Sequence, residues 1–519
     1  MTAIRPLRLL SDTLVRSAER RPDDVALVAG ETRLTYAELL DRALRFARAA
    51  QDLGVRRGDR VVLYLDNSEH CVVSLYGTLL AGAVFVVVNP QTKEDKLGYI
   101  IEDCEARLVV TEGPIAVAGV AAASRAPSVV ATLVAERPAG LDGGADLEPA
   151  LAAAPPEPAA TGVIPLDLAA LIYTSGSTGL PKGVMMTHLS MVFAAESIAE
   201  YLRLEEDERI LGLLPLAFDY GLYQLLMTVR LGATLVLERS FAYPAQIIRR
   251  VVDEQVTVFP GVPTVYATLL ATHEREPLSM PTVRRVTNTA AALLPAMHEG
   301  LRQIFPNALI FAMYGLTECK RVSYLEPELL HEKPSSVGRP IPGTETVVLA
   351  DDGTPVQPGE HGILHVRGPH VMVGYWNKPE LTADMLREGP NPGERMLCTH
   401  DHFTVDEDGF LYFVGRTDDI IKTRGEKVSP LEVENVLQGI AGVQEAAVVG
   451  VPDPVLGEAV RAFVVLTEGA ELTEKQIIAA CRSRIEGYMV PREVLFLDEL
   501  PKTTSGKVRK KSLTEGSTG

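Results

Sequence analysis

The chain lacks the features that mark membrane, disulfide-rich and nucleic-acid-binding proteins. No run of about 18 uncharged apolar residues occurs, so no membrane-spanning helix is predicted. Its five cysteines are scattered without a CxxC pair, which argues against a disulfide framework and a cysteine-based metal site. Basic residues are outnumbered: 50 Lys and Arg against 68 Asp and Glu give a net charge of −18. This balance argues against general nucleic-acid binding, which requires a basic face.

The start of the sequence carries no apolar signal core. Residues 1–24, MTAIRPLRLLSDTLVRSAERRPDD, contain arginines throughout. Together with the sparse cysteines, this predicts a cytoplasmic protein. The acidic net charge and the missing apolar run predict no nucleic-acid partner and no membrane partner.

The chain is too long for a single hydrophobic core. Its 519 residues, 46% hydrophobic and 23% charged, have the composition of a globular protein with two or more domains. The pattern predicts a helix over 9–20, then strand, helix and strand over 60–66, 74–80 and 84–89. Near-continuous apolar strands such as VFVVVN predict a buried parallel sheet. Further strands are predicted at 168–173, 211–214, 233–237, 256–259, 283–287 and 309–311.

Three stretches depart from this α/β pattern. Residues 113–162 are rich in Ala, Pro and Gly, which predicts a surface connection with a strand and a helix near 128–136. From 343 to 413 the helical period disappears and glycines and prolines increase, which predicts a smaller β subdomain. A polar run over 418–427 predicts a boundary, followed by an α+β module of about one hundred residues. Its predicted elements are a helix at 430–439, strands at 443–450 and 460–466, and a helix at 474–484.

The strongest functional signal is the stretch 173–188, YTSGSTGLPKGVMMTH. Its glycines and hydroxyls can close around phosphate oxygens, and a lysine adds positive charge. The residues concerned are Thr174, Ser175, Gly176, Ser177, Thr178, Gly179 and Lys182. A Walker A loop is excluded because Pro181 precedes and Gly183 follows the lysine. A flexible linker is disfavoured because a predicted strand precedes the loop and an amphipathic segment, 185–201, follows it.

TSGSTGLPKG closely resembles the phosphate loop of the adenylate-forming superfamily, which includes acyl-CoA synthetases, peptide-synthetase adenylation domains and luciferases. The resemblance implies that ATP and Mg²⁺ activate a carboxylate as acyl-AMP, which a thiol then attacks. It implies an α/β fold with a large N-terminal domain, residues 1–417, made of two sheet-containing subdomains and a β subdomain. A small mobile α+β C-terminal domain, residues 418–519, would carry the catalytic lysine.

A second motif, YGLTE at 314–318, follows a predicted strand at the spacing typical of the superfamily. An aromatic ring can stack on adenine, a threonine hydroxyl can bind a phosphate, and a glutamate can hold Mg²⁺. By resemblance, Thr317 contacts the adenylate and Glu318 is the metal ligand. The resemblance implies four further adenylate contacts: Tyr314, Gly315, Ala291 and Ala292. The two alanines would form the floor against the adenine, and Ala290 before them stands where the family often has glycine.

The segment Thr399-His400-Asp401-His402 aligns with the superfamily's T-G-D segment. By resemblance Asp401 binds the ribose hydroxyls, while His400 stands where glycine is usual. A metal site formed by His400, Asp401 and His402 is a weaker alternative, because no further ligand is indicated.

Two motifs near the C-terminus resemble the moving parts of the superfamily. In GRTDDIIK, Arg416 would reach the ribose or phosphate, Asp418 would be the hinge, and Gly425 would line the thiol tunnel. In PKTTSGKVRK, Lys507 would bridge the carboxylate and the α-phosphate in the first half-reaction. A charged linker and a basic tail are the alternatives.

The residues expected to line the acyl pocket differ from the pattern of many acyl-CoA synthetases. In Pro215-Leu-Ala-Phe-Asp-Tyr-Gly221, Phe218 replaces the histidine of many acyl-CoA synthetases and Asp219 follows. This pair resembles the amino-acid-activating branch, in which the aspartate accepts hydrogen bonds from the substrate ammonium. A buried carboxylate is costly unless a cation meets it, and an amino acid supplies that cation.

Lys320 and Arg321 follow the predicted metal ligand directly. Arginine offers a planar fork for a carboxylate. With Phe218, Asp219 and Tyr223, these residues are expected to line the acyl pocket and to suit an amino acid with a second carboxylate. The set resembles stand-alone ligases that load β-amino acids of the 3-methylaspartate type onto carrier proteins for macrolactam polyketides.

Three alternatives remain open. Asp219 and Arg321 could pair with each other, or Lys320 and Arg321 could face solvent. The chain could be a conventional fatty or aryl acyl-CoA ligase. A catalytically silent binding module is a third alternative, opposed by the intact set Lys182, Glu318, Asp401, Arg416 and Lys507.

The acceptor must come from outside this chain, as an acyl carrier protein or as free CoA. Carrier proteins are usually acidic, so a local basic patch is expected despite the net charge. Its candidates are Lys422, Arg424 and Lys427.

Overall fold

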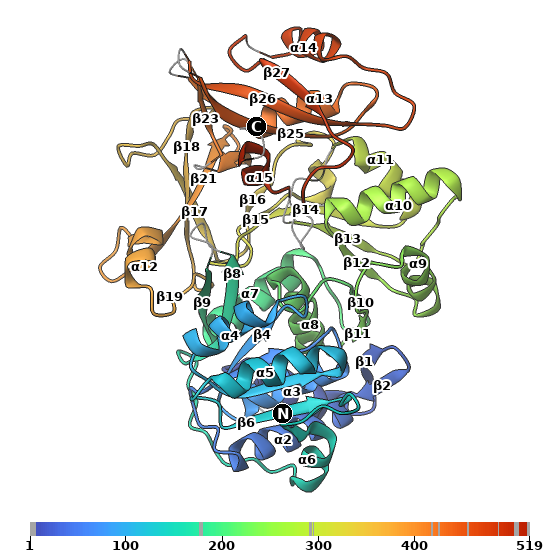
Figure 1. Cartoon of the computed structure of the whole chain (residues 1–519), viewed down its shortest axis with the longest axis vertical. Helices are drawn as coiled ribbons and strands as arrows, with labels where there is room; N and C mark the ends of the chain where they lie inside the picture. Colours follow the sequence, from blue (N-terminus) through green and yellow to red (C-terminus); the bar gives the residue numbers. More distant parts are fainter. Residues whose placement is uncertain are drawn as a thin grey trace. The chain divides into compact units, whose positions relative to one another are not determined.

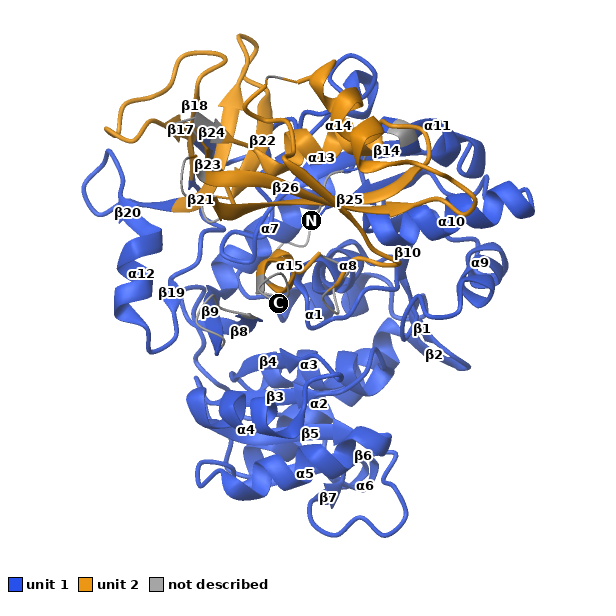
Figure 2. Ribbon diagram, turned by 45° about the horizontal axis from the view of Figure 1, so that its top comes forward, with its two compact units in different colours: residues 1–346, 366–397 blue, residues 347–365, 398–519 orange. Residues whose placement is uncertain are grey.

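The computed structural model describes residues 7–175, 180–289, 293, 295–416, 419–423, 426–453, 456–485, 487–502 and 508–515. The chain divides into two compact units (Figure 2). Unit 1 contains residues 1–346 and 366–397, and unit 2 contains residues 347–365 and 398–519. The boundary predicted between residues 417 and 418 falls on two residues outside the described part of the chain.

Unit 1 contains an eight-stranded sheet in the order β19-β9-β8-β4-β3-β5-β6-β7 (Figure 1). Strand β4 (Val84–Val88) is buried along its whole length and pairs in parallel with β3 (Arg60–Tyr64), as the continuous apolar run predicts. The other strands are β5 (Ala106–Glu112), β6 (Ala131–Ala135), β7 (Ala145–Asp146), β8 (Leu168–Ser175), β9 (Pro181–Thr187) and β19 (Gly374–Tyr375).

Two helices of this first region, α2 and α3, begin at residues whose side chains cap them. Helix α2 (Tyr36–Asp52) starts with a capping box, in which Thr35 accepts from the Glu38 amide and Glu38 accepts from the Thr35 amide. Ser68 caps α3 (Glu69–Leu80) by accepting from the amide of Cys71. Helices α1 (Asp12–Arg20) and α3 confirm the helices predicted over 9–20 and 74–80.

Two predictions of local structure are corrected. Residues 113–162 are more regular than a surface connection: they contain α5 (Ala116–Arg125), α6 (Leu147–Ala153) and β6, which pairs in parallel with β5. Five alanines among the ten residues of α5 supply helix propensity that the nearby prolines and glycines obscured. The segment 185–201 begins as strand, because β9 runs antiparallel to β8, and only α7 (His188–Tyr201) is helical.

A second, nine-stranded sheet in unit 1 has the order β16-β15-β14-β13-β12-β10-β11-β1-β2. Neighbours from β14 to β1 pair in parallel, so their carboxyl ends meet at one edge, where ligands bind in open α/β sheets. These strands are β1 (Val25–Ala29), β2 (Thr32–Thr35), β10 (Arg209–Gly212), β11 (Thr234–Leu237), β12 (Val258–Gly261), β13 (Arg285–Asn288), β14 (Leu309–Tyr314), β15 (Ser323–Tyr324) and β16 (Arg339–Pro340). The helices that accompany them are α8 (Asp219–Leu231), α9 (Pro244–Asp253), α10 (Pro263–Arg275) and α11 (Pro295–Ile304).

The predicted β subdomain is a five-stranded sheet, in which β21 pairs antiparallel with β20 and with β22. Its main path is β17-β18-β21-β20, and β22 pairs with β21. The bounds are β17 (Glu345–Leu349), β18 (His361–Arg367), β20 (Leu386–Glu388), β21 (Arg395–Val405) and β22 (Leu411–Arg416).

The C-terminal part of unit 2 is the predicted α+β module. A sheet of order β24-β23-β26-β25, with β27 beside β26, packs its apolar face on α13 and α14. The elements are β23 (Ile421–Thr423), β24 (Glu426–Val428), α13 (Pro430–Gln438), β25 (Val443–Asp453), β26 (Gly457–Leu466), α14 (Glu474–Arg482), β27 (Glu493–Phe496) and α15 (Lys510–Glu515). These observations confirm the predicted mixed α/β fold class. No helix in the described ranges is long and apolar enough to cross a membrane.

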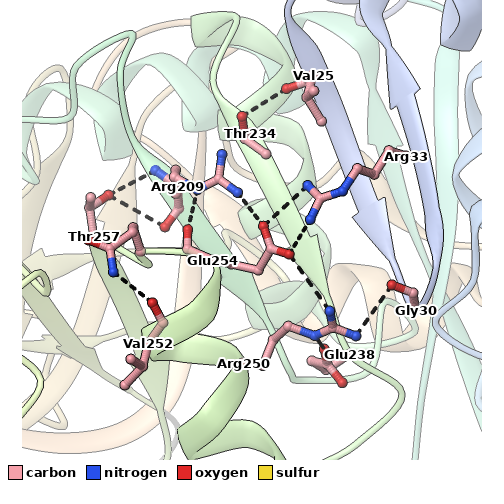
Figure 3. A network of polar contacts seen from close by, with 11 residues as sticks. Val25, Gly30, Arg33, Arg209, Thr234, Glu238, Arg250, Val252, Glu254 and Thr257 are labelled. Atoms are coloured by element: carbon pink, nitrogen blue, oxygen red, sulfur yellow. Dashed lines mark hydrogen bonds and ion pairs between the residues drawn. The ribbon is translucent and has the colours of Figure 1, made fainter.

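A buried carboxylate contacts arginines from two strands of the second sheet and from helix α9. Glu254, directly after α9, lies among Arg33 of β2, Arg209 of β10 and Arg250 of α9, a group called the Glu254 cluster below (Figure 3). Glu254 oxygens lie 2.5 Å from Arg33 Nη2, 2.5 Å from Arg209 Nη2 and 3.7 Å from Arg250 Nη1. Burial opposes ionisation of Glu254, but Arg33 and Arg209 outweigh it and hold its pKa below the ordinary value.

Candidate functional site

The phosphate-loop motif connects two paired strands. Thr174 at the end of β8 stands opposite Lys182 at the start of β9, so the antiparallel pairing brings both ends of the loop together. The Thr174 hydroxyl is buried without a hydrogen-bond partner in the described part of the chain. Ser175 is described only as backbone in β8. Residues Gly176, Ser177, Thr178 and Gly179 lie outside the described residues.

The YGLTE motif forms a tight turn after β14. A Cβ at Gly315 would lie 2.2 Å from the carbonyl oxygen of Lys320, so only glycine permits this approach. The Lys320 amide donates to the Leu316 carbonyl at 2.7 Å, and Lys320 itself has a φ of +67°. Thr317 lies on this turn, and its carbonyl accepts a 3.0 Å hydrogen bond from Lys320 Nζ. The turn therefore places residues of the nucleotide motif and of the predicted acyl pocket within one short segment.

Lys182 and Glu318 meet at a tyrosine that sequence analysis did not identify. The hydroxyl of Tyr375, in β19, donates to Glu318 Oε1 at 2.6 Å and accepts from Lys182 Nζ at 2.7 Å. Lys182 Nζ also lies 3.5 Å from Glu318 Oε1 and 4.1 Å from the centroid of the Tyr375 ring. A cationic group for phosphate and a carboxylate for a divalent metal thus stand side by side.

The predicted acyl-pocket residues form a buried charged group, called the Asp219 cluster: Asp219, Tyr223, Lys320 and Arg321. Asp219 is the first residue of α8 and Tyr223 lies one turn later, so both point to the same side of the helix. Lys320 Nζ lies 2.9 Å from Asp219 Oδ1, and the two side chains are 1% and 11% exposed. Arg321 is 4% exposed, and its Cζ lies 5.0 Å from the centroid of the Tyr220 ring.

This geometry contradicts two of the alternatives given above, an Asp219–Arg321 pair and solvent-facing Lys320 and Arg321. The partner of Asp219 is Lys320 rather than Arg321, and neither cation faces solvent. The positive φ of Lys320 turns its side chain back toward α8. Phe218, partly buried, precedes α8 as its N-cap residue.

Several polar atoms of the Asp219 cluster have spare hydrogen-bonding capacity. Both oxygens of Asp219, the Tyr223 hydroxyl and Arg321 Nε are buried without a hydrogen bond of good geometry among the described residues, and the close Lys320 contact is an ion pair only. Burial, and then the charge of Asp219, raise the pKa of Tyr223 well above its ordinary value, so its hydroxyl stays protonated. The cluster holds one carboxylate and two cations. Its composition suits a ligand that brings a further negative group.

The ribose motif lies in unit 2. Asp401 of β21 stands opposite Arg416 of β22, and Asp401 Oδ1 lies 3.3 Å from Arg416 Nε. Thr399 accepts from the Asp401 amide at 3.1 Å and donates to the Leu364 carbonyl at 2.8 Å, which fixes the backbone before the carboxylate. His400 has a φ of +55°, so it adopts the left-handed conformation that glycine takes most easily.

Five further predicted positions lie outside the described residues: Ala291, Ala292, Asp418, Gly425 and Lys507. The same holds for Ala290, Arg424 and the side chains of Lys422 and Lys427. The residues on either side of the catalytic-lysine motif are described: Lys502 and Val508 form a β-bridge, and Lys510 Nζ lies 2.7 Å from Glu434 Oε1.

A Mg²⁺ ion fits Glu318 better than the His400, Asp401 and His402 alternative. No group of three His, Cys, Asp or Glu side chains suited to a metal occurs in the ranges that the structure describes. Mg²⁺ usually takes one or two carboxylates and completes its shell with water and substrate phosphates. A single carboxylate beside a phosphate-loop lysine provides that donor set.

Comparisons with known proteins identify the family of the chain. The family described as AMP-binding enzyme matches residues 14–376, and the AMP-binding enzyme C-terminal domain matches residues 432–507. The chain is 36% identical to a feruloyl-CoA synthase from Amycolatopsis sp over 503 residues, which cover 96% of each protein.

Two solved structures resemble the whole chain. An anthranilate CoA ligase in complex with anthranoyl-AMP has a TM-score of 0.90 and 28% identity, covering 98% of this chain and 97% of that one. ATP-bound MatB from Rhodopseudomonas palustris has a TM-score of 0.87 and 30% identity, covering 98% of each chain. The chain therefore belongs to the AMP-binding enzyme family, as an AMP-forming ligase of the acyl-CoA ligase type that uses ATP to make an acyl-AMP.

Proposed function

We propose that the enzyme activates an amino-dicarboxylic acid of the aspartate or 3-methylaspartate type and transfers it to the phosphopantetheine thiol of an acyl carrier protein. The observation that carries this proposal is the Asp219 cluster, which has two buried cations for one buried carboxylate. An acid that brings an ammonium for Asp219 and a free carboxylate for the two cations would add no net charge to this buried group. Arg321 Nε is buried without a hydrogen-bond acceptor among the described residues.

The ligand would exchange with an ion pair that the protein already contains. The substrate ammonium takes the place of Lys320 beside Asp219, and the free carboxylate of the substrate lies between Lys320 and Arg321. Each buried charge keeps an opposite charge, so the desolvation cost of the cluster is offset in the complex. The Tyr223 hydroxyl offers one more donor to the bound acid.

A fatty acid or an aromatic acid offers no such exchange. Its apolar part would cover the Asp219–Lys320 pair and Arg321 without satisfying them. A buried polar group that remains unpaired costs about 1–3 kcal/mol, and more when it is charged. The cluster thus favours the charged acid and disfavours the apolar one.

The reacting carboxylate would lie on the other side of the Gly315–Arg321 turn. There Lys182 holds a phosphate oxygen, Thr317 contacts the adenylate, and Glu318 would hold Mg²⁺, which neutralises phosphate charge when bound. In unit 2, Asp401 and Arg416 take the ribose and phosphate, and Lys507 bridges the carboxylate and the α-phosphate. The C-terminal domain then turns about Asp418, so that the thiol arrives beside Gly425.

The second candidate function is that of a conventional aryl or fatty acyl-CoA ligase. The feruloyl-CoA synthase relative favours it, because it covers nearly the whole chain and its name specifies CoA as the acceptor. In that case the Asp219–Lys320 pair would be a structural ion pair. The carrier-protein acceptor rests on the resemblance of the substrate signature to stand-alone carrier-protein ligases.

ATP–pyrophosphate exchange across a panel of acids tests the proposal. The panel contains aspartate and 3-methylaspartate isomers, β-alanine-type amino acids, α-amino acids, ferulate and medium-chain fatty acids. Exchange led by amino-dicarboxylates supports the proposal, and exchange led by apolar acids overturns it. The winning acid is then offered with CoA and with a phosphopantetheinylated carrier protein to identify the acceptor.

Arg321→Ala separates recognition of the second carboxylate from catalysis. We expect loss of exchange by about a hundredfold with the amino-dicarboxylate, since a desolvated charge-assisted contact is lost. A neutral β-amino acid without that carboxylate should be used as well as by the unmodified enzyme. Equal losses with both acids would remove Arg321 from substrate recognition.

A further inference from the structure

The segment 372–376 joins the two nucleotide motifs of unit 1 through its backbone. The Met372 amide donates to the Glu318 carbonyl at 2.8 Å, and the Trp376 amide donates to the Gly183 carbonyl at 2.8 Å. Between them, β19 pairs with β9, with Tyr375 opposite Val184. The Tyr375 amide is held in turn by Thr382 Oγ1 at 2.9 Å. These hydrogen bonds therefore fix the backbone of Tyr375 relative to both motifs.

The Tyr375 hydroxyl lies between two opposite charges. It is 2.7 Å from Lys182 Nζ and 2.6 Å from Glu318 Oε1, whereas the two charged atoms are 3.5 Å apart. A charge-assisted N–H···O contact between a lysine and a carboxylate closes to about 2.7–2.9 Å when nothing intervenes. Tyr375 is 2% exposed and Glu318 is 8% exposed, so bulk water does not substitute for this hydroxyl.

We propose that Tyr375 is a positioning residue that keeps Lys182 and Glu318 from closing on each other and so keeps both available to Mg²⁺ and ATP. The uncharged phenol hydroxyl forms a charge-assisted hydrogen bond with each group. When phosphate and metal arrive, Lys182 and Glu318 exchange contacts with one hydroxyl instead of breaking a tight ion pair. The binding energy of the nucleotide is therefore not consumed in separating opposite charges.

Tyr375→Phe tests the role, because it keeps the ring and its packing and removes only the hydroxyl. Without the spacer, Lys182 and Glu318 close into a direct ion pair that competes with the ligand. We expect the affinity for Mg²⁺·ATP, measured by calorimetry without any acid, to fall about tenfold, or ~1.4 kcal/mol. In pyrophosphate exchange the KM for ATP should rise by a similar factor, while the KM for the acid stays unchanged.

Two further variants make the result decisive. Tyr64→Phe is the matched control, because Tyr64 is also 2% exposed and its hydroxyl donates to the carbonyls of Pro90 and Thr92, away from this group. Its affinity for Mg²⁺·ATP should match that of the unmodified enzyme. In a Glu318→Gln background, where no ion pair can close, Tyr375→Phe should change ATP affinity by less than twofold. An unchanged affinity of Tyr375→Phe itself, or an equal tenfold loss in the Gln background, would overturn the proposal. The binding measurement contains no acid, so it is independent of the proposed substrate.

Discussion

The Glu254 cluster and the Asp219 cluster each pair a carboxylate with cationic side chains, but they differ in how far the carboxylate is hydrogen-bonded. Glu254 faces three arginines and its oxygens accept hydrogen bonds from Arg33 and Arg209 (Figure 3). Those arginines reach the surface, with Arg33 53% exposed and Arg209 28% exposed. Asp219 faces one lysine that is 1% exposed and accepts no hydrogen bond of good geometry within the described part of the chain.

The contrast separates a structural ion cluster from a candidate binding site. A buried ion pair alone says little about stability or function, because the desolvation cost offsets the attraction. Whether the buried polar groups have hydrogen-bond partners is more informative about function. The Glu254 cluster joins β2, β10 and α9 and leaves its carboxylate fully used. The Asp219 cluster is buried, carries one more cation than carboxylate, and has donors and acceptors without partners among the residues that the structure describes, which is what a polar ligand would satisfy.

The largest effect is expected from Asp219→Asn. The amide keeps the size of the side chain but loses the charge that would meet the substrate ammonium. We expect kcat/KM for pyrophosphate exchange with the best amino acid to fall by about 10² to 10³, as for other desolvated charge pairs. The matched variant Glu254→Gln should retain the value of the unmodified enzyme per folded molecule. Comparable losses in the two variants would erase the functional distinction between the clusters.

For the stability of the fold, in contrast to activity, we expect the replacement of Glu254 to matter. Glu254→Ala leaves three guanidinium groups without their shared carboxylate. Because the arginines are partly exposed, we expect the free energy of unfolding to fall by about 1–3 kcal/mol rather than by the full cost of a buried charge. Urea denaturation followed by circular dichroism measures this loss. A stability equal to that of the unmodified protein would show that the cluster contributes no net free energy.

The sequence predicted that the charged residues of the Asp219 cluster lie together, but it did not predict which of them form a pair. Asp219, Lys320 and Arg321 were identified from position in the chain, and the structure brings all three into one buried group. The pairing depends on the positive φ of Lys320 and on the close packing of Gly315 against it, which no residue pattern specifies. Tertiary geometry, rather than residue type, decides which of two adjacent cations meets the carboxylate.

Local periodicity also has clear limits in this chain. Strand β9 was missed because its residues continue into α7 without a break in hydrophobicity, whereas its pairing with β8 is a long-range choice. Tyr375 was missed because a two-residue strand carries no periodic signal. Gly374, directly before Tyr375, has a φ of +154°, which suits glycine. The regular α/β elements, by contrast, follow from apolar runs of the right length.

The smallest expected effect is the pH dependence of the contribution of Glu254 to stability. The arginines hold the pKa of Glu254 below its ordinary value, so its contribution is present above the unfolded-state pKa of about 4.3 and is lost as pH falls through the lower folded-state pKa. The difference in unfolding free energy between the unmodified protein and Glu254→Gln should be constant from pH 6 to 8 and shrink below about pH 4. Urea titrations at each pH measure it. A difference that grows on acidification would mean that burial, which favours the protonated carboxyl, outweighs the arginines, and the Glu254 cluster would then resemble an unsatisfied site rather than a completed one.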